Sequence, residues 1–350
     1  MRNHIKIGKF VVGEDCPPLI VAEMSGNHNH SIEKAIEIVE KAASAGVHAI
    51  KLQTYTADTL TIDLNEGDFY LNDKNSLWNG MSLYELYQKA YTPWEWHEKI
   101  FTRCKELGLL CFSSPFDNSA VDFLESINCP CYKISSTENT DYELLKKVAL
   151  TGKPVIVSTG MASIEELGAM ISELTKAGCK ELILLKCTAA YPALPTDANL
   201  KTIRHMKEMF DCPIGLSDHS LGIGVAISSV AFGAVMVEKH ITLSRSEGGV
   251  DSAFSMEPSE FKQLVIESKI AWESKGTISY GPTNSENSSL SRRSLYVVED
   301  IKNGEILTKY NLRSIRPGYG LSVKYLNELL GMKVTSDIKR GTRMSWDLVR

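Results

Sequence analysis

The sequence predicts an α/β fold: a closed (β/α)₈ TIM barrel followed by a small C-terminal β-rich module. Three observations support this prediction. Short apolar runs alternate with amphipathic segments, the alternation repeats eight times, and a polar linker separates it from a differently patterned tail. Eight strand–helix units within the first 280 residues fit a closed barrel better than an open sheet.

The eight strands are expected where short runs of apolar residues occur. They span residues 19–23, 47–53, 109–113, 131–135, 154–159, 181–187, 213–217 and 234–240. Helical periodicity follows each run, over 31–45, 93–107, 118–127, 142–150, 164–177, 200–210, 222–232 and 259–273. A glycine, which can adopt the left-handed conformation that closes a helix, precedes four of the strands: Gly46, Gly108, Gly152 and Gly178.

Two segments interrupt this pattern. Residues 54–93 are far longer than an ordinary strand-to-helix connection and are rich in aromatic and acidic residues, which predicts a lid or partner-contacting excursion. Residues 281–293 are rich in serine and asparagine, which is typical of a linker. In the tail, the segments 300–307 and 337–344 are similar in sequence. The expected boundaries are a barrel over 1–280, a linker over 281–293 and a β-rich module over 294–350.

Composition and charge exclude several classes of protein. Hydrophobic residues make up 43% and charged residues 23%, which are ordinary globular values. The 38 basic and 43 acidic residues give a net charge of -5, so no nucleic-acid partner is expected. The N-terminus lacks the apolar core of a signal peptide, and no apolar run approaches the roughly 20 residues that span a bilayer. We therefore expect a cytoplasmic protein without a membrane partner, whose eight scattered cysteines are small buried hydrophobes.

Nearly every predicted strand turns polar at its C-terminal end, where TIM-barrel enzymes have their active sites. The polar residues at these ends include Glu23, Lys51, Gln53, Ser114, Lys133, Ser136, Glu138, Ser158, Tyr191, Ser217, His219 and His240. One polar strand end would only mark the start of a loop, but polar residues at all eight indicate a common cause. Burying an unpaired ammonium is costly, so Lys51 and Lys133 predict a ligand with phosphate and carboxylate groups. Lys239 is expected to point outward between helices and to be structural.

His219 and His240 are expected at the ends of neighbouring strands, close enough to share one divalent ion. A single histidine on a strand is more often a hydrogen-bonded core residue. Two on adjacent strand ends, beside Asp218, Glu23 and Asp251, favour a metal site instead. Two imidazoles with oxygen ligands suit a divalent metal such as Mn²⁺ or Mg²⁺ and leave positions open for a Lewis-acid role.

The motifs at the strand ends resemble those of the N-acetylneuraminate synthase family. They are AEMSGNH (22–28), IKLQTY (50–55), FSSPF (112–116), YKISSTE (132–138), STGM (158–161), CTAAYP (187–192), GLSDHS (215–220) and EKH (238–240). The tail motif IRPGYGL (315–321) resembles the antifreeze-like, or SAF, domain of the same family. The resemblance covers almost the whole chain, and the conjunction of motifs is specific. It implies a metal-dependent synthase that condenses phosphoenolpyruvate with an amino-sugar aldehyde.

The resemblance also implies roles for individual residues. Phosphoenolpyruvate would be held by Lys51, Ser114, Lys133, Ser136, Ser158 and Ser217, and the metal by His219 and His240. The sugar would be faced by Gln53, Glu138, Tyr191 and Asp251. Glu23 matches the catalytic carboxylate of the family, and either Glu23 or Glu138 would activate water. Arg316 matches an arginine that the SAF domain inserts into a partner subunit's barrel, which implies a domain-swapped homodimer.

Residues 76–97 and the YKISSTE motif resemble one branch of the family. That branch makes pseudaminic acid, a component of bacterial surface or flagellar glycans, from phosphoenolpyruvate and 2,4-diacetamido-2,4,6-trideoxy-L-altrose. Ala189 stands where sialic acid synthases carry asparagine, which disfavours N-acetylmannosamine as the acceptor. The alternatives are a sialic or legionaminic acid synthase, a Schiff-base aldolase using Lys133 or Lys186, and a non-catalytic sugar- or ice-binding protein.

Overall fold

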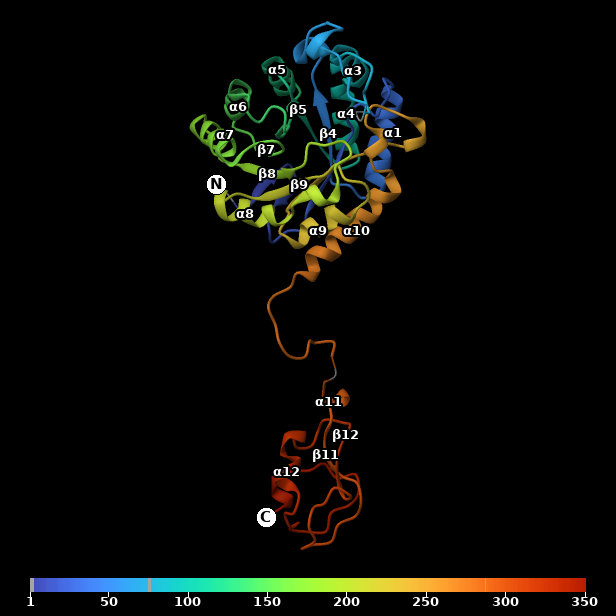
Figure 1. The fold of residues 1–350 in the computed structure, drawn as a ribbon, viewed down its shortest axis with the longest axis vertical. Helices are drawn as coiled ribbons and strands as arrows, with labels where there is room; N and C mark the ends of the chain where they lie inside the picture. Colours follow the sequence, from blue (N-terminus) through green and yellow to red (C-terminus); the bar gives the residue numbers. More distant parts are fainter. Residues whose placement is uncertain (1–2, 75–76, 287) are drawn as a thin grey trace. The chain divides into compact units, whose positions relative to one another are not determined.

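The computed structural model describes residues 3–74, 77–286 and 288–350, which belong to two compact units, Met1–Gly276 and Thr277–Arg350 (Figure 1). Residues 75 and 76 of the predicted excursion and residue 287 of the predicted linker lie outside the described residues. The first unit contains a closed barrel of eight parallel strands, in which the last strand pairs with the first. The predicted TIM barrel is therefore confirmed.

The barrel strands follow one another in chain order around the ring. They are β3 Leu19–Glu23, β4 Ala49–Thr54, β5 Leu110–Pro115, β6 Tyr132–Ile134, β7 Val155–Ser158, β8 Leu182–Cys187, β9 Ile214–Ser217 and β10 Met236–His240. Because both faces of these strands are covered, they begin as apolar runs, and polar or charged residues appear in their C-terminal parts. The register of β10, β3 and β4 places His240 opposite Glu23, and Glu23 opposite Lys51. Polar residues from three strands therefore meet at one end of the barrel.

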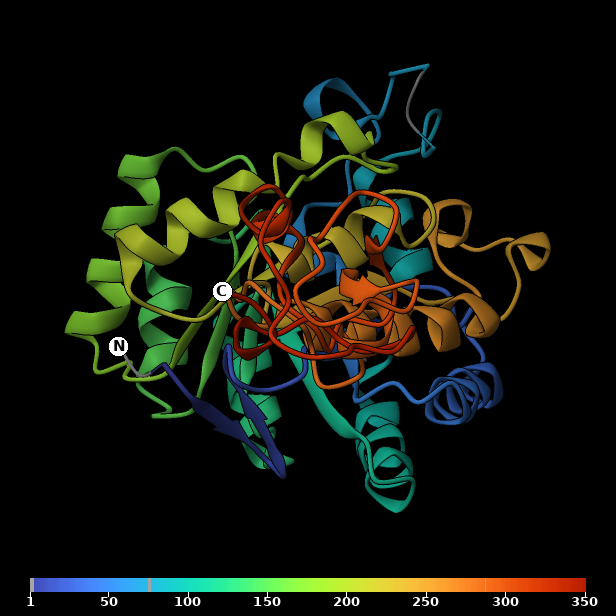
Figure 2. The same cartoon turned by 90° about the horizontal axis from the view of Figure 1, so that it is seen from below.

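An outer ring of helices surrounds the strands (Figures 1 and 2). These helices are α1 Ile32–Ser44, α4 Trp94–Glu106, α5 Asn118–Ser126, α6 Tyr142–Ala149, α7 Ile164–Lys176, α8 Lys201–Phe210, α9 Gly224–Ala231 and α10 Pro258–Ser274. Gly46 and Gly178 follow α1 and α7 with φ angles of +85° and +101°, as predicted for residues that close helices. No helix within the described part of the chain is both long and apolar enough to cross a membrane.

A short antiparallel hairpin at the N-terminus was not predicted from the sequence. It consists of β1 Ile5–Ile7 and β2 Phe10–Val12, drawn in dark blue in Figure 2. Its buried side chains share a hydrophobic cluster with the barrel strands, and a Cβ at Gly8 would lie 3.3 Å from Leu110, the first residue of β5. The hairpin therefore packs where the strands begin and leaves their C-terminal ends free.

The excursion between β4 and α4 contains the short helices α2 Ala57–Leu60, η1 Gly67–Phe69 and α3 Leu83–Ala90. At both ends of this excursion a buried histidine contacts a threonine hydroxyl. His28 Nε2 lies 3.2 Å from Thr92 Oγ1, and His97 Nε2 lies 2.8 Å from Thr54 Oγ1. Burial lowers the pKa of His28 and of His97 from the usual 6.5 to about 4, so both rings are neutral in the folded chain at neutral pH.

Acidification should therefore destabilise the protein well above the pH at which its carboxylates are protonated. The unfolded chain binds protons at these histidines below pH 6.5, whereas the folded chain binds them only near pH 4. The free energy of unfolding should fall between these limits by on the order of 3 kcal/mol per histidine. Urea denaturation at several pH values measures this loss. His97→Gln should reduce the slope and His205→Gln, on the exposed face of α8, should not; equal slopes would contradict the assignment.

The second unit is a small β-rich module. It contains β11 Ser294–Val297 paired with β12 Leu312–Ile315, together with α11 Ser288–Ser291, η5 Val323–Tyr325, α12 Leu326–Leu329 and η6 Trp346–Leu348. The two segments of similar sequence, 300–307 and 337–344, form ion pairs with each other in both directions. Lys302 Nζ lies 2.7 Å from Asp337 Oδ2, and Lys339 Nζ lies 2.7 Å from Asp300 Oδ2. Such exposed ion pairs contribute little to stability, so the buried isoleucines between them are the stronger link.

Candidate active site

A cavity of about 300 Å³ opens at the C-terminal end of the barrel and has two walls of opposite character. Strand ends and the loops that follow them supply the polar wall, which includes Ser25, Gln53, Thr137, Tyr191, His240 and Asp251. The excursion supplies the largely apolar wall, which includes Leu71, Trp78, Leu83, Leu86, Tyr87 and Ala90. A concave site with convergent polar groups on one side suits a small amphipathic ligand.

Four buried charged groups lie together at the same end of the barrel. Lys51 forms an ion pair with Glu23, and Lys51 Nζ lies 3.5 Å from Glu238 Oε1. Lys133 Nζ lies 3.6 Å from the same Glu238 oxygen. The exposed fraction of each of these side chains is 5% or less. The two buried lysines therefore have anionic partners within the protein, so that their burial alone does not require an anionic ligand.

The pKa values within this cluster shift in different directions. Burial raises the pKa of Glu23, against the opposing effect of Lys51. Burial also acts to raise the pKa of Glu238, but the ammonium groups of Lys133 and Lys51 together lower it. Burial lowers the pKa of Lys133, although Glu238 opposes the change. Glu23 is therefore the carboxyl group of the pair that takes up a proton more readily.

Serine hydroxyls lie at the ends of the neighbouring strands. Ser114 Oγ accepts a hydrogen bond from Lys51 Nζ at 3.3 Å, and Ser136 Oγ accepts one from the Gly160 N–H at 3.1 Å. Ser217 is buried at the end of β9. Ser158 Oγ is buried too, and within the described ranges it has no hydrogen-bond partner. These hydroxyls and the two lysines thus face one end of the barrel, with donors available to an anionic ligand.

His219 and His240 lie side by side, with ring centroids 5.4 Å apart. His219 Nδ1 lies 2.9 Å from the Thr188 carbonyl oxygen, which can only accept, so Nδ1 carries a hydrogen. Burial, and next the neighbouring His219, hold the pKa of His240 well below its usual value, so its imidazole is neutral. Its Nδ1 is buried without a hydrogen-bond partner among the described residues and lies 3.5 Å from Asp251 Oδ2.

This pair fits a divalent cation that takes the rest of its ligands from outside the protein. Neutral imidazole is the form that binds metals, and Asp251 lies beside the neutral His240. Burial acts to lower the pKa of His219 too, but its hydrogen bond to Cys187 raises it, so the two rings differ. Across residues 3–74, 77–286 and 288–350 there is no group of three or more histidine, cysteine, aspartate or glutamate side chains arranged to hold a metal.

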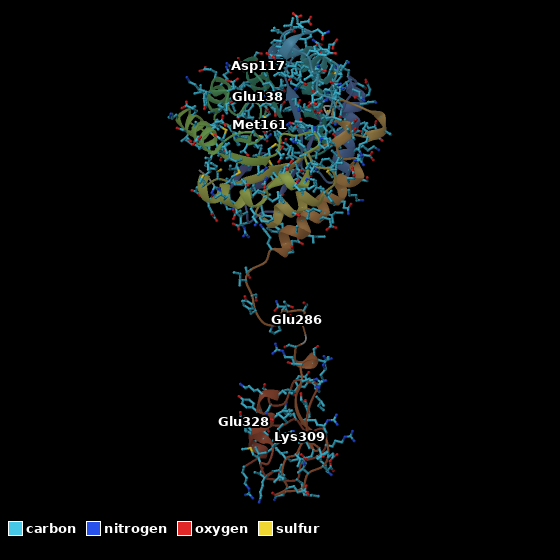
Figure 3. The ribbon with its side chains drawn as sticks, in the orientation of Figure 1. Asp117, Glu138, Met161, Glu286, Lys309 and Glu328 are labelled. Carbon is cyan, nitrogen blue, oxygen red and sulfur yellow. The ribbon has the colours of Figure 1, made fainter. Side chains whose placement is uncertain are left out.

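Of the residues predicted for the sugar, Gln53, Tyr191 and Asp251 line the cavity, and Glu138 directly follows the lining residue Thr137. The carboxylate of Glu138 accepts hydrogen bonds from Ser135 and, at 2.7 Å, from Thr137 Oγ1, and burial raises its pKa. Figure 3 labels Glu138 in the loop after β6 and Met161 in the loop after β7. The ring centroids of Tyr191 and His219 are 4.5 Å apart.

Arg316 is the one predicted site residue outside the barrel unit. It directly follows β12 in the second unit. The barrel unit by itself therefore brings together the predicted lysines, serines, histidines and carboxylates without an arginine.

Lys239 holds the loop that carries His219. Its Nζ donates to Asp218 Oδ2 at 2.7 Å and to the Ser220 carbonyl oxygen at 2.7 Å, so it binds the residues on either side of that histidine. Lys239 also directly precedes His240 in β10. The outward, structural orientation predicted for this lysine is confirmed, and the ion pair fixes both histidines relative to each other.

Two residues near the site could not be singled out from the sequence. Cys187, grouped there with the buried hydrophobic cysteines, is hydrogen bonded to His219 at the end of β8. Burial disfavours its thiolate, but His219, with further help from Ser136 and Lys133, lowers the pKa of Cys187 to about 7. Asn139 Nδ2 donates to the carbonyl oxygens at the end of β7, at 3.3 Å and 3.2 Å. The only sequence signal for Cys187 was its position at a polar strand end.

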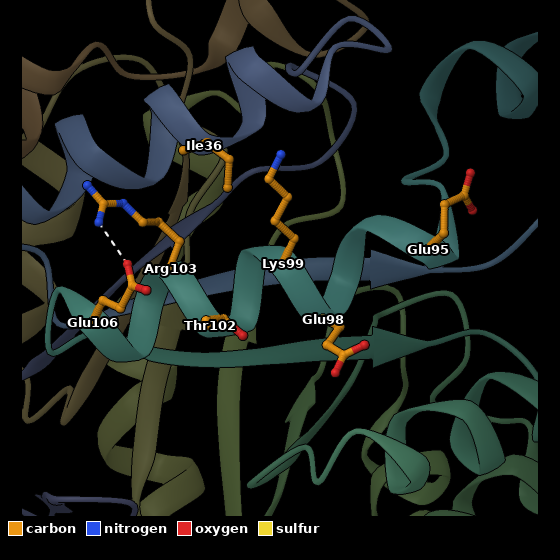
Figure 4. A pocket seen from close by; sticks show the side chains of 7 residues that line it. All are labelled: Ile36, Glu95, Glu98, Lys99, Thr102, Arg103 and Glu106. Carbon is orange, nitrogen blue, oxygen red and sulfur yellow. Dashed lines mark hydrogen bonds and ion pairs between the residues drawn. The ribbon is translucent and has the colours of Figure 1, made fainter.

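A second hollow, of about 480 Å³, lies between the outer faces of α1 and α4 (Figure 4). Its lining residues all belong to those two helices, and none lies at a strand end. Arg103 at its edge is paired with Glu106 and Glu40, so its charge is already matched. The candidate site is therefore placed at the barrel end and not in this groove.

Comparisons with known proteins agree with this geometry. A family model described as the NeuB family matches residues 38–280, and one described as the SAF domain matches residues 292–350. A pseudaminic acid synthase from Campylobacter jejuni strain 81-176 is 42% identical over 96% of this chain and 97% of its own. One from Helicobacter pylori is 41% identical over 95% of this chain and 97% of its own. The crystal structure of an N-acetylneuraminic acid synthetase from Leptospira borgpetersenii in complex with citrate has a TM-score of 0.73 and 31% identity. It covers 81% of this chain and 93% of that one.

Proposed function

The chain belongs to the NeuB family, and from that premise we propose that it condenses phosphoenolpyruvate with 2,4-diacetamido-2,4,6-trideoxy-L-altrose to give pseudaminic acid and phosphate. The observation that supports this most strongly is the buried cluster of two ammonium and two carboxylate groups, which lies at the same end of the barrel as the paired imidazoles. One of these imidazoles, that of His240, lines the cavity of about 300 Å³. This arrangement suits an anionic substrate on one side and a sugar on the other.

Phosphoenolpyruvate would bind over the two lysines. Its phosphate and carboxylate would accept hydrogen bonds from Lys51 and Lys133, with neutral donors from the serine hydroxyls at the strand ends: Ser114, Ser136, Ser158 and Ser217. The unpartnered Ser158 hydroxyl supports this orientation, because a buried hydroxyl without a partner is unfavourable until a ligand binds.

The reaction would begin with attack of C3 of phosphoenolpyruvate on the aldehyde carbon of the sugar, which leaves positive charge at C2. The carboxylates of Glu23 and Glu238, buried next to the lysines, would stabilise that charge. Water would then add at C2 with loss of its proton to Glu23 or Glu138. Phosphate would leave by cleavage of the bond between C2 and the bridging oxygen, so the enzyme would be a transferase.

His219 and His240 would hold a divalent cation, Mn²⁺ or Mg²⁺. When bound, such an ion supplies Lewis-acid polarisation of the aldehyde oxygen. Gln53, Tyr191 and Asp251 would orient the hydroxyl groups of the acceptor from the polar wall of the cavity. We further propose a cytoplasmic, domain-swapped homodimer in which Arg316 of one subunit completes the sugar site of the other.

A Schiff-base aldolase is the second candidate, since burial lowers the pKa of Lys133 and so favours the amine that would act as nucleophile. Phosphate release from phosphoenolpyruvate separates the two. The synthase should release phosphate only with both substrates present, should use the altrose sugar in preference to N-acetylmannosamine, and should stop when EDTA removes the metal. Trapping of pyruvate on the protein by borohydride, with activity unaffected by EDTA, would instead establish the aldolase.

A further inference from the structure

Trp78 links the apolar wall of the cavity to the polar wall. Trp78, in the excursion, donates a hydrogen bond from its indole Nε1 to the Val250 carbonyl oxygen at 3.0 Å. Its ring centroid lies 5.8 Å from that of Tyr191. Val250 precedes Asp251, so Trp78 contacts the two loops that supply Tyr191 and Asp251 to the polar wall. The indole therefore sets the distance between the two walls.

The chemical contrast between the walls restricts the kind of sugar that fits. Leu71, Leu83 and Leu86 line the cavity on the same side as Trp78, and their side chains offer neither donors nor acceptors. A hydroxyl placed against such a wall loses its hydrogen bonds to water, whereas a methyl group gains from burial there. A sugar whose hydroxyls face Tyr191 and Asp251 must turn its opposite edge toward the leucines.

We propose that Trp78 is a specificity-determining residue, which holds the apolar wall against the C6 methyl and acetamido methyl groups of the acceptor. It thereby selects N-acylated deoxy sugars over sugars that carry a hydroxyl at the same edge. This inference rests on the proposed function, because it concerns the second substrate of that reaction. An apolar site discriminates against an added hydroxyl by about 10²-fold in kcat/KM, which sets the scale of the effect.

The test compares Trp78→Ala and Trp78→Phe with Trp272→Ala in the full-length enzyme. Trp272 is a matched control, because its indole Nε1 also donates to a backbone carbonyl, that of Glu14, at 3.0 Å, and it does not line the cavity. For each variant, kcat and KM are measured for the altrose sugar, for N-acetylmannosamine and for phosphoenolpyruvate. The melting temperature of each variant is measured alongside.

Trp78→Ala should raise KM for the altrose sugar and reduce the preference for it over N-acetylmannosamine by at least about 10-fold. KM for phosphoenolpyruvate should stay within about twofold of wild type, since the lysines that hold it lie on the barrel strands. Trp78→Phe keeps an apolar ring against Tyr191 but loses the hydrogen bond to Val250, so it should retain only part of the preference. Trp272→Ala should behave as wild type.

An unchanged preference in Trp78→Ala would overturn the proposal. A second contradicting result would be an equal loss of kcat/KM for both sugars together with a higher KM for phosphoenolpyruvate, because that combination indicates a merely structural role. Failure of the proposed function looks different, because the wild type itself would then release no phosphate with the altrose sugar. If the wild type uses another N-acylated sugar, the preference for that sugar over its hydroxylated analogue in Trp78→Ala decides the inference.

Discussion

Lys133→Met should raise the KM for phosphoenolpyruvate by at least about 10²-fold, because it removes one of two buried cations that would hold the substrate's anionic groups. The fold should survive the change. Lys51 Nζ lies 3.5 Å from the Glu238 oxygen that Lys133 contacts, so this carboxylate keeps a cationic partner. Steady-state phosphate release at varied phosphoenolpyruvate concentration measures the effect, with thermal melting as the check on folding.

Lys186→Met is the matched control for this prediction. Lys186 lies on β8, which β7 separates from the strand of Lys133. Its Nζ reaches Thr188 Oγ1 at 3.0 Å and the Cys187 carbonyl oxygen at 3.2 Å rather than the charge cluster. Its replacement should leave the KM for phosphoenolpyruvate within a few fold of wild type. A larger increase in Lys186→Met than in Lys133→Met would contradict the assignment of the phosphoenolpyruvate site.

Glu23→Gln should lower kcat by about 10³-fold with little change in either KM, as expected when a general base is lost. Within the described part of the chain, neither oxygen of Glu23 accepts a hydrogen bond from a neutral group, and its ion pair with Lys51 is its principal contact. Burial raises the pKa of Glu23, which improves its ability to accept a proton near neutral pH. Single-turnover phosphate release would show whether chemistry, rather than product release, has slowed.

Glu138→Gln is the variant to compare with it. One oxygen of the Glu138 carboxylate, Oε2, already accepts hydrogen bonds from the hydroxyls of Ser135 and Thr137, which makes Glu138 the weaker candidate for the base. We expect replacement of Glu138 to lower kcat by about tenfold or less, because the change would remove a hydrogen-bonding contact and not the group that accepts the proton. A larger loss in Glu138→Gln than in Glu23→Gln would reverse the two roles.

The barrel could be predicted from sequence because its strands are buried on both faces and its helices are amphipathic. Strand β3 matches its predicted bounds at 19–23, and the other strands agree within a few residues. The N-terminal hairpin could not be predicted, since strands of three residues are too short to show a period. Its fold depends on burial of Ile5 and Ile7 against distant barrel residues, which local pattern does not show.

The candidate site was only partly predictable for a related reason. Polar strand ends indicate which residues gather at the barrel end, because parallel strands share a direction. They do not indicate which side chains pair, so the contacts of Lys51 and Lys133 with Glu238 became visible only in three dimensions. The same holds for Trp78 and Val250, which are far apart in sequence and meet through one hydrogen bond.

The central claim is that C3 of phosphoenolpyruvate attacks the aldehyde and that water then adds at C2, so that phosphate leaves by cleavage of the bond between C2 and the bridging oxygen. The most direct test of this claim follows that bridging oxygen. Phosphoenolpyruvate labelled with oxygen-18 between C2 and phosphorus is turned over with the altrose sugar, and the released phosphate is examined by phosphorus NMR. The claim predicts that the label leaves with the phosphate. Unlabelled phosphate would show cleavage between phosphorus and oxygen and would contradict it.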